Sequence, residues 1–123
     1  MKTSELGRAT VDELVETFVS LCIAQDMELL RGDVPAINRL FDQIEVVKQE
    51  LKSRPGDQRS ALVPLYQHDN MQVRLKAAKA TLAVAPEAAR KALVEIKASG
   101  WQPQAGDAGM SLWNLDRGVF KPT

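Results

Sequence analysis

The chain has 123 residues, with 16 basic and 16 acidic side chains, one cysteine and one histidine. One Cys and one His cannot form a disulfide or a Cys/His zinc site within the chain, so we expect no metal site and no cofactor. No apolar run approaches the roughly 20 residues that a membrane span needs, and no signal peptide is recognisable. We therefore expect no membrane contact and a cytoplasmic location.

Residues 1–52 are predicted to form an N-terminal pair of long antiparallel helices. Thr10 and Glu13 have the spacing of a capping box, which predicts a first helix over about residues 11–30. A glycine that can end this helix is followed directly by an N-cap aspartate, so a second helix should span about residues 34–51. Because the connection is short, we expect the two helices to pack against each other.

The first helix carries two apolar stripes, so its C-terminal half should be buried on two sides. A monomer seldom leaves such a stripe exposed to water. We expect the second stripe to be buried either against the rest of the chain or in a two-fold homodimer through this helix, and we favour the homodimer. This stripe consists of Val19, Ile23, Met27 and Leu30.

The segment 53–56, with the sequence Ser-Arg-Pro-Gly, is the clearest break in the chain, because Pro and Gly both interrupt helices. The charge balance also changes there: residues 1–52 have 6 Lys/Arg and 10 Asp/Glu, whereas residues 53–123 have 10 and 6. Such an asymmetry can steer binding partners, or it can make the two halves attract each other. We interpret the break as a loop within a single all-helical domain spanning residues 1–123.

Four shorter helices are predicted after the break, over about residues 57–67, 69–82, 87–98 and 107–117. Pro64 should bend the first of them. Asp69 and Asn70 are good N-cap residues for the second, which is rich in alanine. This second helix is apolar around most of its circumference, so it should be sandwiched between neighbouring helices.

The alanine-rich helix also contains a recognisable pattern, in which Asp-Asn is followed by Val-Arg and Ala-Ala within residues 69–78. A weak internal repeat accompanies it, because Ala-Leu-Val at residues 61–63 recurs at residues 92–94. Together with the Gly-Asp-Ala-Gly-Met segment at residues 106–110, the region 57–117 resembles HEAT-repeat proteins. The whole chain resembles a short bacterial family of HEAT-like proteins known only as a domain of unknown function.

This resemblance implies an all-α fold with about six helices. It implies that residues 57–117 form HEAT-like helix pairs stacked as an α-α superhelix, preceded by the long N-terminal antiparallel pair. A bacterial source is implied as well. The resemblance carries over no activity, substrate or catalytic residue.

The sequence contains no pattern typical of an enzyme active site, so we expect no catalytic residue and no enzymatic activity. Carboxylates at helical spacing, such as Glu13 and Glu16, are interpreted as exposed surface. His68 precedes an N-cap turn and has no titratable neighbour assigned by sequence, so we interpret it as a turn residue rather than a catalytic base.

Five residues are candidates for partner binding. Lys76 and Lys79 form a polar stripe on the alanine-rich helix, which should line the concave face of a helical solenoid, although solvation alone also explains them. The loop from Trp101 to Asp107 is expected at the rim of this face, with Gln104 and Asp107 as contact residues. Tryptophan is strongly enriched in binding hot spots.

Three further residues are assigned structural roles. Asp69 is an expected helix cap. Arg74 should be partly buried and form either an ion pair or a carbonyl contact with the neighbouring helix pair, with Asp107 as its preferred partner. Trp113, like Trp101, is more often a core residue than an interface anchor.

From these features we expect a non-catalytic protein–protein interaction module whose partner is a protein with an acidic surface. An inhibitor or immunity-type protein that neutralises a cognate toxin is an alternative. A HEAT-like enzyme acting on DNA bases is a weaker alternative, because the basic excess in the C-terminal half is small, and we expect no binding to nucleic acid.

Overall fold

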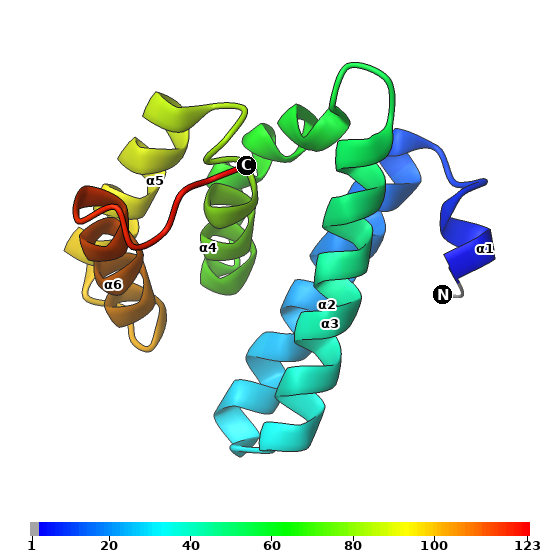
Figure 1. The fold of residues 1–123 in the computed structure, drawn as a ribbon. Helices are drawn as coiled ribbons and strands as arrows, with labels where there is room; N and C mark the ends of the chain where they lie inside the picture. Colours follow the sequence, from blue (N-terminus) through cyan, green and yellow to red (C-terminus); the bar gives the residue numbers. More distant parts are fainter. Residues whose placement is uncertain (1–2) are drawn as a thin grey trace. The chain divides into compact units, whose positions relative to one another are not determined.

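The computed structural model describes residues 3–123. This part of the chain consists of helices joined by short loops and contains no strand (Figure 1). The prediction of an all-α fold with about six helices is confirmed. Six α-helices and one 3₁₀-helix are present in this range: α1 (Thr3–Leu6), α2 (Val11–Arg31), α3 (Val34–Ser53), η1 (Gln58–Gln67), α4 (Met71–Ala80), α5 (Pro86–Ser99) and α6 (Gln104–Asp116). The chain divides into two compact units, the first ending at Ala61 and the second spanning Leu62–Thr123.

The first unit is built on the antiparallel helices α2 and α3, which pack against each other as expected (Figure 1). The predicted capping box is present: the Thr10 hydroxyl accepts from the Glu13 N–H at 3.1 Å, and the Glu13 carboxylate accepts from the Thr10 N–H at 3.1 Å. Gly32 ends α2 in the left-handed conformation, with φ of 72°, which favours glycine. The fully buried apolar side chains of the pair are Leu14, Phe18, Cys22, Val47 and Leu51.

Helix α1 was not predicted, since four residues are too few to give a periodic pattern. Arg54, just after α3, donates from Nη2 to the carbonyls of Leu6 and Ala9 at 2.9 and 2.8 Å, and from Nε to the Glu50 carboxylate at 2.7 Å. This guanidinium therefore fixes the chain between α1 and α2 to the end of α3. The planar fork of arginine suits such a contact better than lysine would.

Three of the four residues in the second apolar stripe of α2 are exposed in the structure, and Val19 is half-buried, so the rest of the chain does not cover the whole stripe. Ile23, Met27 and Leu30 are 40%, 49% and 80% exposed. They lie toward the end of α2, where α3 begins and covers only the opposite side. The homodimer through this helix remains a prediction.

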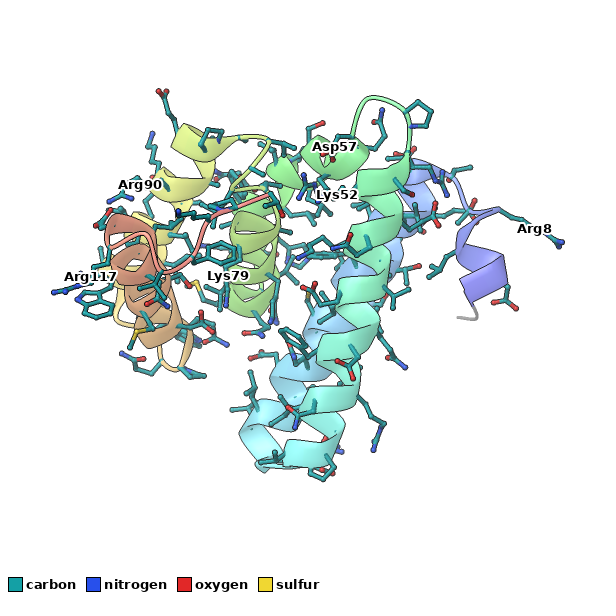
Figure 2. All side chains as sticks on the ribbon, in the orientation of Figure 1. Arg8, Lys52, Asp57, Lys79, Arg90 and Arg117 are labelled. Atoms are coloured by element: carbon teal, nitrogen blue, oxygen red, sulfur yellow. The ribbon has the colours of Figure 1, made fainter. Side chains whose placement is uncertain are left out.

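The segment that follows α3 turns sharply at Asp57, which has a positive φ of 51° (Figure 2). Its carboxylate accepts from Nε and Nη2 of Arg59 at 2.9 and 2.7 Å, and these hydrogen bonds hold the pKa of Asp57 below its ordinary value. The next ten residues form the 3₁₀-helix η1 instead of the expected α-helix. Pro64 lies inside it and has no N–H to donate, which disfavours a regular α-helix there.

The second unit contains α4, α5 and α6, which pack against one another. Asn70, and not Asp69, is the N-cap of α4, because the Asn70 side chain accepts from the Val73 N–H at 3.1 Å while Asp69 is exposed. Helix α4 is buried on most sides, as its composition predicted. The core of the unit consists of Leu75, Ala78, Leu82, Ala89, Ala92, Leu93, Ile96, Ala108 and Leu112.

Tyr66 and Thr81 connect the end of η1 to the end of α4. Their hydroxyls form a hydrogen bond, and Thr81, which is fully buried, also donates to the Ala77 carbonyl at 2.8 Å. Burial raises the pKa of the Tyr66 phenol. Within residues 3–123, no helix is both long and apolar enough to cross a membrane.

Candidate functional site

An open groove of about 520 Å³ lies on the surface of the second unit, between the end of α5 and one face of α6. The lining side chains come from the last turn of α5, from the loop that follows it and from three turns of α6. They are Lys97, Gln102, Ala105, Gly106, Gly109, Met110 and Trp113. A volume of this size is in the range of small-molecule sites, although this groove is open to solvent.

Two glycines leave the space that the groove occupies. Gly106 and Gly109 are three residues apart on α6 and therefore lie on one face of the helix. A Cβ atom at Gly109 would lie 3.7 Å from the Lys97 side chain, which is ordinary van der Waals contact. Gly106 is more constrained, because its N–H donates to the Gln102 side chain at 2.9 Å. Any residue larger than glycine at these positions would narrow the groove.

Two large apolar side chains of α6 form the rest of the surface. Met110 is 59% exposed and Trp113 is 50% exposed. The guanidinium of Arg117 lies 4.1 Å from the centroid of the Trp113 ring, in a cation–π contact that holds the indole in place. The groove thus combines a flat aromatic wall, a flexible thioether and the glycine face of α6.

The charged side chains around the groove are unevenly paired. On α6, Asp107 accepts from Lys79 at 2.9 Å, and Asp116 accepts from Arg90 at 2.7 Å. Within residues 3–123, Lys97 and Arg117 form no ion pair. In Figure 2, Lys79 extends from α4 toward α6, whereas Arg117 points away from α4. The acids of α6 are therefore paired, whereas Lys97 in the groove and Arg117 on the ring of Trp113 are not.

The structure brings together only two of the five residues predicted for partner binding, Lys79 and Asp107, in an ion pair between α4 and α6. Lys76 is half-buried, so the two lysines do not form a fully exposed stripe. Gln104 is buried and donates from its amide to the Gln72 side chain at 2.9 Å. This burial places Gln104 in the core and corrects its expected position on the binding surface.

Trp113 and Arg74 also differ from expectation. Trp113, which was assigned a structural role, is half exposed and does not fill the core, whereas Trp101, a candidate for partner binding, is 64% exposed. Asp107 is not the partner of Arg74, since Arg74 donates from Nε to the carbonyl of His68, in the turn before its own helix.

Sequence reasoning did not identify the groove. Its one signal was Gly109, which lies inside the predicted last helix, where a glycine costs about 1 kcal/mol relative to alanine. Lys97, Gln102 and Met110 carried no signal of their own, because each of these residue types is ordinary on a helix or loop surface.

Comparisons with known proteins identify the family of the chain. A crystal structure of the protein RPA1889 from Rhodopseudomonas palustris CGA009 is similar, with 51% sequence identity and a TM-score of 0.93, covering 96% of this chain and 98% of that chain. No protein with a curated description matches. The model of the family described as "Domain of unknown function (DUF2019)" matches residues 12–116. The chain therefore belongs to the DUF2019 family of domains of unknown function.

Proposed function

We propose that this protein is a non-catalytic protein-binding module, and that the groove between α5 and α6 is its partner-binding surface. The observation that carries the proposal is the exposure of Met110 and Trp113 beside two glycines on one helix face. Aromatic side chains and methionine are enriched in protein interfaces relative to the rest of the surface. Helical glycines at a surface groove are costly for stability, which supports a role in binding.

The proposal includes a HEAT-like arrangement of the second unit. The segments η1 and α4 form one helical pair in sequence, and α5 and α6 form the next. Successive helix pairs of this kind present an extended surface for partners without catalytic machinery. The partner in this proposal is a protein, met in the cytoplasm, and no nucleic acid is involved.

Site-specific photocrosslinking in the native host tests the proposal. A benzophenone amino acid replaces Met110 in the groove, and in a matched control it replaces Ala88. Ala88 is exposed on the same helix as Lys97, nine residues earlier, which is about 13 Å along the helix axis. We expect a discrete protein adduct from position 110 that is absent from position 88. Equal labelling at both positions would contradict the proposal.

A further inference from the structure

We propose that the groove between α5 and α6 recognises an acidic peptide segment of its partner. In this proposal one large apolar side chain of the segment packs between Met110 and Trp113, and flanking carboxylates contact Lys97 and Arg117. This inference rests on the proposed function, since it names the chemistry of the partner at that same site.

The apolar part of the recognition follows from the shape of the groove. Its volume of about 520 Å³ is open to solvent along α6, so it suits a side chain that enters from an extended or helical segment. The Arg117 guanidinium, 4.1 Å from the centroid of the Trp113 ring, favours one orientation of the indole by about 0.5–1 kcal/mol, which reduces the side-chain entropy lost on binding. An apolar anchor can therefore be buried against a preformed wall.

The acidic part follows from the unpaired charges. Lys97 lines the groove, and Arg117 stacks on its aromatic wall, yet in the part of the chain that the structure describes neither forms an ion pair. A guanidinium stacked on a ring keeps its in-plane N–H groups available to a carboxylate. The second unit as a whole carries 8 Lys/Arg and 5 Asp/Glu, so the wider field also favours an acidic partner.

Both cations also lie at helix C-termini, where positive charge offsets the helix dipole. That role accounts for their position along the helices. It does not account for an exposed indole and thioether between them, or for the glycines that keep the space open. An acidic segment with one apolar residue would match this site, because the site places unpaired cations beside an apolar anchor position.

The test is selection from a random library of short peptides, displayed without bias in charge. Peptides that bind the wild type are kept, and those that also bind Gly109→Leu, in which a leucine fills the groove, are removed. Ala88→Leu is the matched control, because it adds the same side chain outside the groove. We expect groove-dependent peptides to contain one large apolar residue flanked by Asp or Glu. Circular dichroism verifies that each variant is folded.

The charge contribution is then measured with the best selected peptide. Lys97→Glu should weaken its binding by about tenfold or more, as expected for reversing a contacting charge. Lys91→Glu makes the same change in net charge on an exposed lysine of α5 outside the groove, and should change the affinity by less than about twofold. Raising the salt concentration from about 0.05 M to 0.5 M should strongly lower the affinity of the wild type for the peptide, because salt screens the attraction between charges. The affinity of Lys97→Glu should change little.

The outcomes separate this inference from the proposed function. Groove-dependent peptides that are neutral or basic, or equal effects of Lys97→Glu and Lys91→Glu, would overturn the acidic-segment proposal and leave the binding module standing. A single-stranded oligonucleotide that displaces the peptide and binds more tightly would also overturn it. If no peptide distinguished wild type from Gly109→Leu, both proposals would fall.

Discussion

Replacing Gly109 with alanine should stabilise the protein while partly filling the groove. Alanine is favoured over glycine inside a helix by about 1 kcal/mol. The new methyl would meet three carbons of the Lys97 side chain at 3.7 to 3.8 Å, and each such contact adds about 0.1–0.2 kcal/mol. The expected gain in the free energy of unfolding is therefore about 1.3–1.6 kcal/mol.

Gly106→Ala is the matched comparison, because it makes the same change one turn earlier on α6. A Cβ at Gly106 would lie 3.0 Å from the Gln102 Oε1 that accepts from the Gly106 N–H. Displacing that amide loses a hydrogen bond worth about 1 kcal/mol, which offsets the helix gain. We expect this variant to be close to wild type in stability.

Urea unfolding followed by tryptophan fluorescence measures both variants. Both tryptophans of the chain, Trp101 and Trp113, belong to the second unit, so the signal reports on the part that contains the substitutions. The reasoning would be refuted by a Gly109→Ala protein no more stable than wild type, since the space beside Lys97 would then not exist as described. It would also fail if Gly106→Ala gained as much as Gly109→Ala.

Three further outcomes are expected. Tyr66→Phe should lower the unfolding free energy by about 1 kcal/mol, because it removes the hydrogen bond to Thr81; chemical denaturation gives the value, and an unchanged midpoint would show that this bond contributes nothing. Asp57→Asn should destabilise at neutral pH. The hydrogen bonds from Arg59 depress the folded-state pKa of Asp57, so they stabilise above its ordinary pKa of 3.8, and the difference from wild type should vanish as acid protonates the folded carboxyl. A difference independent of pH would contradict that cause. Light scattering should give twice the chain mass of 13.6 kDa for wild type and the single mass for Leu30→Asp, whereas a monomeric wild type would exclude the homodimer.

The fold could be predicted where the signals are local. The capping box of Thr10 and Glu13 fixed the start of α2 to the residue, because both partners are three positions apart in the chain. The glycine and aspartate after α2 likewise marked the start of α3. The burial of α4 followed from its alanine-rich composition, which leaves only a narrow polar stripe.

The predictions from sequence fail in two situations. Either two neighbouring residues suit the same role almost equally well, or the contact depends on residues far apart in the chain. Asp69 and Asn70 are nearly equal as caps, and the backbone geometry of the turn selected Asn70. The ion pair between Asp107 and Lys79 depends on how α4 and α6 pack, which no spacing in the sequence specifies. The groove was missed for the same reason, since it exists only once α5 brings Lys97 beside α6.

The central claim is that the α5–α6 groove binds a protein partner, and the most direct measurement is the affinity of the crosslinked partner for two leucine variants. Gly109→Leu fills the groove, and Ala88→Leu adds the same side chain on an exposed turn of α5 outside it. Calorimetric titration should show at least about a tenfold loss of affinity for Gly109→Leu and wild-type affinity for Ala88→Leu. Equal affinities for the two folded variants would contradict the claim.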